Sequence, residues 1–292
     1  MLQRSTWLHL RIPFSFFLLP VFLFSLATSS SPDNHKTILV FFILHFFLYP
    51  ASNAYNSYFD KDKESIGGLK KPPPVTTELY WVALVLDGLS LLLGLLISWQ
   101  FSLMLLIYGL VSKAYSHPDI RLKKYPIIGW LAAGIFQGSF TFAMVYLAIN
   151  DVAWGDLADP TIIIPAGLST LLLWGSYPMT QVYQHGEDGR RGDQTLSIKL
   201  GILGTFYFTA FVFLLANLGF IWYFKSYYSW NVALVFQLFL VPILVYFFGW
   251  LYRVRRDISS ADYRSTMRLN LISSLCLNLF FGGLWLYTQK LI

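Results

Sequence analysis

The sequence predicts an all-α membrane protein, and two observations lead to that class. Of its 292 residues, 56% are hydrophobic and 18% aromatic, whereas only 12% are charged. An average soluble domain is about 25% charged, so the chain lacks half of the charge that normally solvates a globular surface. The apolar residues also form long stretches, whereas the strands of a membrane barrel alternate over about ten residues. These features exclude an intrinsically disordered chain and disfavour a water-soluble globule.

Nine stretches are long enough to cross about 30 Å of hydrocarbon, which takes about 20 residues of helix. They cover residues 8–30, 37–57, 78–98, 99–115, 126–149, 161–183, 201–224, 230–252 and 267–289. Helices suit this environment because they satisfy their own backbone hydrogen bonds in lipid. The third and fourth stretches adjoin at Ser98, so the turn between them must be very tight. Because no connection is long enough for a soluble domain, we expect residues 1–292 to form a single transmembrane bundle.

Positive charges orient this bundle, since cytoplasmic loops carry an excess of Lys and Arg. With a cytoplasmic N-terminus, all but three of the 21 Lys and Arg residues fall on the cytoplasmic side, the exceptions being Lys36, Lys225 and Lys290. We therefore expect a multi-pass protein of the inner (cytoplasmic) membrane with its polar loops facing the cytoplasm. The net charge of +6 does not indicate nucleic-acid binding, because the basic residues are scattered between apolar stretches.

The first stretch allows two interpretations. Arg4 and Arg11 precede an apolar run that ends in small residues at 27–29, which is the pattern of a cleavable signal peptide. The run is longer than the usual apolar core of such a peptide, and Pro13 and Pro20 interrupt it. We expect a retained helix, with cleavage as the alternative.

The second stretch runs into an acidic loop that covers about residues 56–77. Asn56, Asp60 and Glu64 are four residues apart, so they share one face if the helix continues. Oxygen-bearing side chains at a membrane mouth favour a hard cation, and Mg²⁺ prefers a few carboxylates completed by waters and phosphate oxygens. Lys70 and Lys71 follow within reach of a phosphate. The alternative is a solvated helix end whose acids pair with neighbouring lysines.

A second polar loop, about residues 185–200, follows the sixth stretch. Gln184 and Asp188 repeat the four-residue spacing, and Arg190, Arg191 and Lys199 supply positive charge. Both loops fall on the same predicted side of the membrane, with four predicted helices between them. A ring of helices would bring them face to face around a cavity, and two such loops are harder to attribute to solvation than one.

The first loop resembles the signature of the UbiA superfamily of intramembrane prenyltransferases. That signature is an Asn, then acids four and eight residues later, then a basic residue before Pro. Asn56, Asp60, Glu64 and Lys71 match it. Two positions depart from it: Glu64 stands where Asp is commoner, and Ser57 replaces a frequent Asp. Glu64 keeps the carboxylate on a longer side chain.

The second loop resembles the second acidic motif of this family, which continues as Gly-x-x-Thr-Leu and Lys/Arg-Leu-Gly. Residues 192–201 follow that pattern and set a register in which Asp188 is the second acid and Gln184 replaces the first. Gln184 keeps a carbonyl oxygen but loses a negative charge, which should weaken metal binding unless Glu187 or Asp193 compensates.

A third polar segment, about residues 113–125, agrees with the other two. Tyr115 and Ser116 followed by Leu-Lys-Lys resemble the family's Tyr-Ser…Leu-Lys-Arg segment. A positive-inside loop would explain the basic residues but not the Tyr-Ser pair. The number of helices, the orientation and the placement of the loops also match, so the resemblance covers nearly the whole chain.

The resemblance implies Mg²⁺-dependent transfer of a prenyl chain from an allylic prenyl diphosphate to an aromatic or other lipophilic acceptor, among membrane lipids. The residues that would hold the metal are Asn56, Asp60, Glu64, Gln184 and Asp188. The residues that would contact the diphosphate are Lys71, Tyr115, Arg121, Lys123 and Arg191. The residues that would carry catalysis are Asp60, Asp188 and Lys71.

The chemistry is consistent with the composition, and alternatives remain open. Fixed cations and metal ions neutralise a leaving diphosphate, and the 54 aromatic residues offer water-excluding walls for an allylic cation.

A membrane terpene cyclase would use the same ionisation without a separate acceptor. A carrier is disfavoured because the acids gather on one face rather than at the midplane, and a non-catalytic binding protein would fit Gln184.

Asp87 and Cys276 lie inside the predicted spans. Asp87 is an intramembrane acid, which indicates either a functional group or a protonated side chain that is hydrogen-bonded to a neighbouring helix. Cys276 is the single cysteine, so the chain has no disulfide framework and no cysteine-based metal site.

Overall fold

The computed structural model describes residues 2–290, and every regular element among them is a helix, which confirms the predicted all-α class. The α-helices are α1 (Arg4–Leu10), α2 (Leu19–Ala27), α3 (Asn34–Phe42), α4 (Tyr49–Asp60), α5 (Thr77–Leu95), α6 (Trp99–Ser116), α7 (Pro126–Ile135), α8 (Thr141–Asn150), α9 (Pro160–Ser176), α10 (His185–Arg191), α11 (Leu196–Tyr227), α12 (Trp230–Arg256) and α13 (Tyr263–Thr288). Short 3-10 or π segments join them: η1 (Ile12–Phe17), η2 (Ile43–Leu48), η3 (Leu122–Lys124), η4 (Phe136–Phe140), η5 (Trp154–Ala158), η6 (Tyr177–Gln181) and η7 (Ile258–Ser260).

Among residues 2–290, seven helical segments are long and apolar enough to cross a membrane. They are Asn34–Asp60, Thr77–Leu95, Pro126–Asn150, Pro160–Gln181, Leu196–Tyr227, Trp230–Arg256 and Tyr263–Thr288. The N-terminal pair Arg4–Phe17 and Leu19–Ala27, bent by 40°, makes eight if it forms one span. The predicted stretch 99–115 is helix α6, which is not among the seven. The structure supports a multi-pass membrane protein, and the count of nine stays a prediction.

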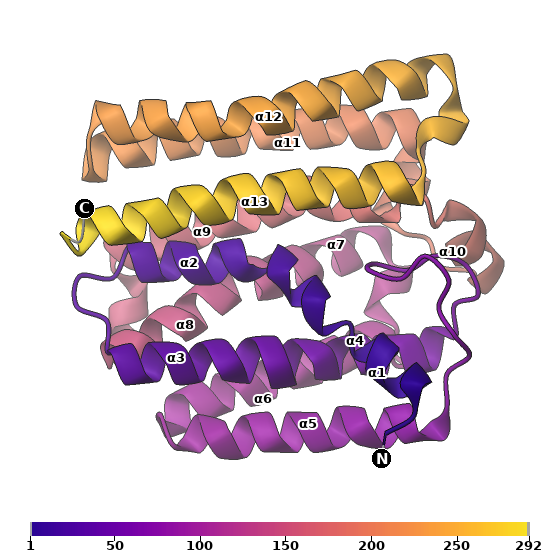
Figure 1. Cartoon of the computed structure of the whole chain (residues 1–292), viewed down its shortest axis with the longest axis horizontal. Helices are drawn as coiled ribbons and strands as arrows, with labels where there is room; N and C mark the ends of the chain where they lie inside the picture. The colour runs from indigo at the N-terminus through magenta and orange to yellow at the C-terminus, as the bar shows by residue number, and fades with distance from the viewer. Residues whose placement is uncertain (1, 291–292) are drawn as a thin grey trace.

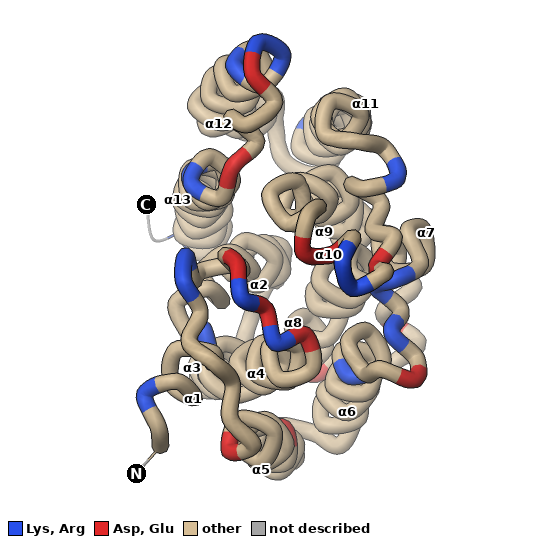
Figure 2. Tube along the Cα trace, turned by 90° about the vertical axis from the view of Figure 1, so that its right-hand side faces the viewer, with Lys and Arg blue, Asp and Glu red and all other residues tan. Residues whose placement is uncertain are grey.

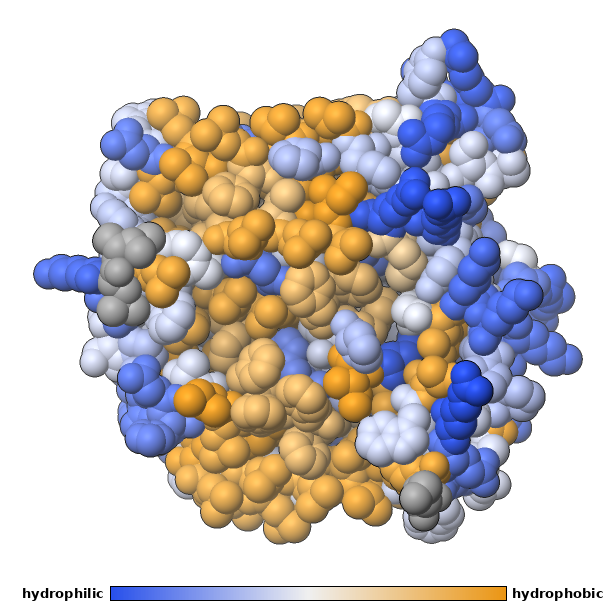
Figure 3. Space-filling model, in the orientation of Figure 1, coloured by the Kyte–Doolittle hydropathy of each residue, from blue (hydrophilic) through white to orange (hydrophobic). Residues whose placement is uncertain are grey.

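The outer surface of the bundle is apolar around its middle. Figure 3 shows hydrophobic side chains over most of the visible face and hydrophilic ones at the two ends. Large side chains on several outer helices are strongly exposed, among them Trp81 (61%), Leu92 (63%) and Leu238 (69%). A belt of this extent is unfavourable in water, because soluble monomers rarely expose large apolar patches. It is suited to lipid.

The helices run roughly side by side, so that the connections gather at two ends (Figure 1). The loops after α4, α6, α9 and α12 lie at the right-hand end of Figure 1, together with α10. These are the loops that the charge pattern predicts to face the cytoplasm. Figure 2 looks onto this end, where Lys, Arg, Asp and Glu cluster around α10 and α4. The fold therefore brings the three polar segments of the sequence together.

The turn between the third and fourth predicted stretches is as short as the sequence requires. Helix α5 ends at Leu95 and α6 begins at Trp99. Ser98 caps α6, because its hydroxyl oxygen accepts a hydrogen bond from the Phe101 N–H at 3.1 Å. The predicted tight turn is thus confirmed.

Close packing in the centre of the bundle depends on a glycine in a π segment. Segment η4 joins α7 to α8, and π segments of this kind insert an extra residue and redirect the side chains around it. Gly138 lies in η4 against α9, where a Cβ atom would come within 2.6 Å of the Thr170 Cα. The Thr170 hydroxyl accepts a hydrogen bond from the Ser139 N–H at 2.9 Å. These contacts fix α9 close to the α7–α8 unit.

Asp87 lies outside the polar end of the bundle and is paired. Lys113 of α6 donates a hydrogen bond to its carboxylate, and the Lys113 ammonium also lies 5.3 Å from the centroid of the Tyr55 ring. An acid within the membrane is commonly paired in this way. The pair links α5 to α6.

Candidate active site

A polar cavity of about 260 Å³ lies at the charged end of the bundle. Its walls come from the end of α4, from α6, from α10 and from the N-terminal segment. The predicted site residues that line it are Asn56, Asp60, Tyr115, Lys123, Gln184, Asp188 and Arg191. The two acidic loops, far apart in the chain, therefore share one cavity.

Helix α4 supplies two of these residues from one face. The Asn56 amide donates to the Ser116 hydroxyl at 2.9 Å. The helix ends at Asp60 because Lys61 adopts the left-handed conformation, with φ of 51°. The helix therefore does not continue to Glu64, which lies in the following loop, half exposed, and pairs with Arg190. The expected stack of three side chains holds for Asn56 and Asp60 only.

Asp60 is buried among cations from the third polar segment. Its carboxylate, 4% exposed, accepts hydrogen bonds from Lys123 and, at 3.3 Å, from Arg121. Arg121 also donates to both oxygens of Asp193, at 2.7 and 2.9 Å. A buried carboxylate keeps its charge only with such partners. Residues from three separate loops thus form one ion-pair network.

Arg191 connects this network to the second acidic loop. Its guanidinium donates to Asp188 at 2.6 Å and to Asp62, and it lies 3.5 Å from Asp193. Burial raises the pKa of Asp188 to about 6, against the opposing effect of Arg191. Burial likewise raises the pKa of Asp62. A further positive charge nearby would therefore stabilise the ionised form of both carboxylates.

Backbone contacts fasten the two acidic loops to each other. The Glu187 carboxylate accepts hydrogen bonds from the N–H groups of Lys63 at 2.8 Å and Glu64 at 3.1 Å. The Gln184 amide nitrogen donates to the Ser65 carbonyl at 3.4 Å. The Gln184 carbonyl oxygen remains as the group that could contact a cation. Glu187 therefore joins the two acidic loops through hydrogen bonds to the backbone.

Two predicted diphosphate partners differ in their placement. Tyr115 lies on the last turn of α6, and its hydroxyl shares a hydrogen bond with the Tyr177 hydroxyl inside the cavity wall. Lys71 is exposed in the loop between α4 and α5 and does not line the polar cavity. Within residues 2–290 it makes neither an ion pair nor a side-chain hydrogen bond. Its predicted role would require this loop to move toward the cavity.

The structure adds two charged residues that sequence reasoning missed. Asp62 lines the polar cavity two residues after Asp60, in the loop where its position relative to the helix was not predictable. Arg11 also lines it, 9% exposed, and donates to the carbonyls of Gly67 at 3.2 Å and Asn53 at 3.1 Å. Among the described residues it has no acidic partner within ion-pair distance, although buried Arg is normally paired. The sequence marked Arg11 only as a flanking charge.

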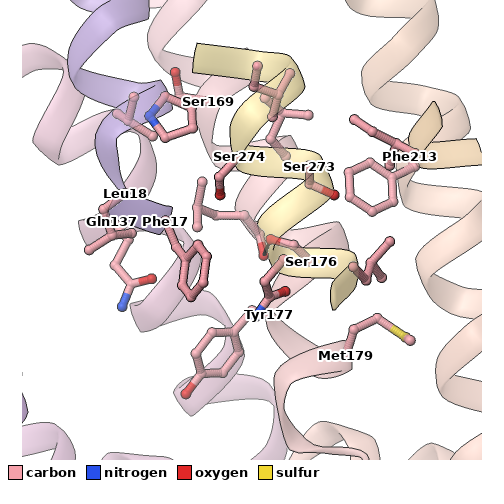
Figure 4. Close-up of a pocket in the computed structure, with 18 of the residues that line it drawn as sticks. Phe17, Leu18, Gln137, Ser169, Ser176, Tyr177, Met179, Phe213, Ser273 and Ser274 are labelled. Carbon is pink, nitrogen blue, oxygen red and sulfur yellow. Dashed lines mark hydrogen bonds between the residues drawn. The ribbon is translucent and has the colours of Figure 1, made fainter. Parts of the chain in front are cut away.

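An apolar cavity of about 640 Å³ adjoins the polar one. It lies between α2, α9, α11, α12 and α13, and Figure 4 shows part of its wall, with Phe17, Phe213 and Tyr177 among the labelled side chains. The residues that line both cavities are Phe14, Ser52, Asn53, Tyr108, Gln137, Tyr177 and Thr180. We call these seven residues the junction, because they lie where the polar cavity meets the apolar cavity.

The ligand atoms at the polar cavity suit a hard cation held together with an anion. Asn56, Asp60, Gln184 and Asp188 offer oxygen atoms only, which Mg²⁺ prefers. Within residues 2–290, no cluster of three or more acids, histidines or cysteines forms a closed metal cage. Mg²⁺ rarely uses such a cage and usually completes its shell with water and phosphate oxygens. The residues therefore fit Mg²⁺ bound together with a phosphate-bearing ligand.

Comparison with known proteins agrees with this geometry. The model of the UbiA prenyltransferase family matches residues 17–272. No curated protein sequence matches the chain.

Several solved structures resemble the fold along almost its whole length. The apo UbiA homologue from Aeropyrum pernix K1 has a TM-score of 0.73 at 17% identity, covering 93% of this chain and 98% of that one. The Archaeoglobus fulgidus UbiA homologue bound to GPP and Mg²⁺ has a TM-score of 0.67 at 16% identity, covering 96% and 99%. A digeranylgeranylglyceryl phosphate synthase has a TM-score of 0.62 at 19% identity, covering 98% of each chain. At these identities the likeness shows the fold.

Proposed function

The chain belongs to the UbiA prenyltransferase family, and we propose that it transfers a prenyl chain from an allylic prenyl diphosphate to an aromatic or other lipophilic acceptor within the membrane. The observation that carries this proposal is the meeting of the polar and apolar cavities at the junction. A prenyl diphosphate has the same two parts, a multiply charged head and an apolar tail. The charged head of the donor would thus fit the polar cavity, and its apolar tail would fit the apolar cavity.

The head of the donor would occupy the polar cavity together with Mg²⁺. Asn56, Asp60, Gln184 and Asp188 would hold the ion. Glu64 lies outside the cavity and pairs with Arg190, so it would join them only if its loop moved inward. The bound ion would neutralise the diphosphate and stabilise it as a leaving group. A relative from Archaeoglobus fulgidus binds GPP and Mg²⁺, which supports this assignment.

The cations of the network would change partners when the donor binds. Lys123 and Arg121 pair with Asp60, and Arg191 pairs with Asp188. If Asp60 and Asp188 coordinated a bound ion instead, Lys123, Arg121 and Arg191 would be free to contact the phosphate oxygens. Each buried charge then keeps an opposite charge beside it, which avoids the large cost of an unpaired ion. Preorganised cations of this kind stabilise negative charge that develops on the leaving group.

The reaction itself would take place at the junction. The bond between the allylic carbon and the diphosphate oxygen breaks, and its electron pair stays on the diphosphate. A new bond forms between that carbon and the nucleophilic atom of the acceptor, whose proton passes to the diphosphate. The rings of Phe14, Tyr108 and Tyr177 face this region and would stabilise positive charge on the allylic group. The surrounding apolar walls exclude water, which would otherwise capture the cation.

The acceptor would be held by neutral polar groups. Asn53, Gln137 and Thr180 belong to the junction. The Gln137 amide makes no hydrogen bond within residues 2–290, and Figure 4 shows its side chain at the cavity wall together with Phe17. It is therefore available to a hydroxyl or carbonyl group. An acceptor with an apolar body and one such group would fit.

A test of this function measures diphosphate release by the purified protein in detergent. Geranyl, farnesyl and geranylgeranyl diphosphates are supplied with a mixed pool of phenolic and lipid acceptors, with either Mg²⁺ or EDTA. We expect release that requires Mg²⁺ and is lost in Asp188→Asn. Mass spectrometry of the products then identifies the acceptor. Formation of a cyclic hydrocarbon from the donor alone would identify a terpene cyclase instead, and absence of donor binding would refute the proposal.

A further inference from the structure

The apolar cavity runs lengthwise through the bundle from the junction. It is lined along α13 from Leu269 to Phe281 and along α12 from Phe248 to Phe236. On each helix the first and last lining residues are 12 positions apart, which at 1.5 Å per residue corresponds to a depth of about 18 Å. The cavity thus has a defined long axis that begins where the reacting carbon would lie.

Four phenylalanines from four helices close the far end of this cavity. Phe24 of α2, Phe220 of α11, Phe236 of α12 and Phe281 of α13 all line it, and each is no more than 1% exposed. The ring centroids of Phe24 and Phe281 lie 4.5 Å apart in a stacked pair. Phe220 lies 4.9 Å from Phe236 and 5.5 Å from Phe24. We call this set the aromatic plug.

A second layer of rings lies behind the aromatic plug. Phe224 is 5.1 Å from Phe236, and Phe280 is 4.8 Å from Phe236, and both are fully buried or nearly so. Neither of these two residues lines the cavity. Removal of one plug ring would therefore lengthen the cavity by about the size of that ring, rather than open it to the other side of the bundle.

The side of the cavity near the junction is more open than its end. Phe211 and Leu214 of α11 and Leu244 and Phe248 of α12 line it and are 43–58% exposed. These residues lie one or more helical turns before the plug. A chain that is too long for the cavity would therefore have to leave sideways into lipid.

We infer that the aromatic plug sets the length of the prenyl chain, so that the preferred donor carries three to four isoprene units; this inference rests on the proposed function. Consecutive Cα atoms of a peptide are three bonds and about 3.8 Å apart, so an extended chain advances about 1.3 Å per bond. One isoprene unit adds four bonds to the chain and therefore spans about 5 Å. A depth of about 18 Å then holds three to four units. The volume agrees, since 640 Å³ divided by about 30 Å³ per water-sized group holds about 21 carbon-sized groups.

The test compares Mg²⁺-dependent binding of geranyl, farnesyl, geranylgeranyl and octaprenyl diphosphates to the purified full chain. The unmodified protein should bind farnesyl or geranylgeranyl diphosphate best, and octaprenyl diphosphate about tenfold or more weaker. Phe220→Ala should move the optimum to a longer donor. Leu277→Phe, one helical turn before Phe281 on α13, should move it to geranyl diphosphate.

Matched variants separate the plug from its surroundings. Phe42→Ala removes the same ring from α3, where Phe42 is 47% exposed and lines neither cavity, and should leave the optimum unchanged. If Phe220→Ala does not fold, Phe220→Leu and Leu277→Phe still test the idea, because the two should shift the optimum in opposite directions. Failure of every donor to bind would refute the proposed function. Binding that rises steadily up to octaprenyl diphosphate, or an optimum that no variant moves, would refute the role of the plug alone.

Discussion

Asp60 is the residue on which the charges of the polar cavity converge. It lies on the last turn of α4 and is held by Lys123 and Arg121, while Arg191 donates to its backbone carbonyl at 3.3 Å. Lys123 and Arg121 come from the third polar segment, and Arg191 comes from the second acidic loop. A change at this single carboxylate should therefore disturb the metal, the phosphate partners and the register of the loops together.

Substitution Asp60→Asn should lower kcat/KM for the donor by about a hundredfold or more, the size of effect seen when one electrostatic stabiliser is removed. The variant keeps the shape of the side chain but loses its charge. Steady-state diphosphate release at saturating Mg²⁺ measures the effect.

The matched control is Asp119→Asn on the same polar face. Asp119 is 87% exposed and lies outside the polar cavity. Its substitution should change kcat/KM by less than about twofold, because exposed ion pairs contribute little. Equal losses in both variants would indicate a general effect of surface charge and would contradict the role given to Asp60.

Gln184 offers a gain-of-function test of the metal site. Gln184→Glu should restore the negative charge that the family's second motif has at this position. A further carboxylate next to Mg²⁺ should tighten its apparent affinity by about tenfold, since a unit charge a few ångströms away is worth one to several kcal/mol. Mg²⁺ titration of diphosphate release measures the shift. Unchanged Mg²⁺ dependence would place Gln184 outside the coordination shell.

At the residue scale, the sequence predicted much of what lines the polar cavity but little of how it is paired. The spacing of Asn56 and Asp60 and of Gln184 and Asp188 was informative because four residues make about one helical turn. The end of α4 was not predictable, since a left-handed Lys61 follows from tertiary contacts rather than from helix propensity. For that reason Glu64 lies away from the cavity.

At the scale of elements, the bundle depends on close contact between α9 and the π segment η4. Figure 1 shows α7, α8 and α9 near one another in the middle of the fold. Gly138 permits this approach because its missing Cβ leaves room for the backbone of Thr170. The π segment was not predictable from the sequence, because it depends on packing.

Gly138→Ala should destabilise the protein by about 1–3 kcal/mol, as expected for overpacking against a rigid backbone. The new methyl group would meet Thr170 Cα at 2.6 Å, so one helix would have to shift. Thermal unfolding in detergent measures the change. Gly167→Ala is the control, since its Cβ would have nothing within 4 Å and should be neutral or slightly stabilising. Equal stability of the two variants would contradict the packing argument.

At the scale of the whole molecule, composition and charge pattern were sufficient for the class and the placement of loops. Long apolar stretches predicted helices because lipid leaves few alternatives for the backbone. The structure of the N-terminal stretch was harder to predict, because Pro13 and Pro20 divide it into a bent pair of helical segments. The apolar cavity was not predictable, since it depends on how five helices tilt around one another. The direction of the bundle in the membrane stays a prediction from Lys and Arg.

Single-cysteine labelling tests that direction. In a Cys276→Ser background, Asp119→Cys lies at the end predicted to be cytoplasmic, and Gly155→Cys lies at the opposite end. A membrane-impermeant maleimide applied to intact cells should label the second variant and not the first. Both should react after permeabilisation, which controls for access. The reverse pattern would overturn the predicted orientation.

The central claim is that both acidic loops hold one metal-bound donor whose tail enters the apolar cavity. The most direct measurement is a crystal structure with geranylgeranyl thiolodiphosphate and Mn²⁺ in place of Mg²⁺. We predict anomalous density between Asp60 and Asp188, the diphosphate beside Lys123, and the tail ending at Phe220 in the aromatic plug. Metal density elsewhere, or a tail outside the apolar cavity, would contradict the account.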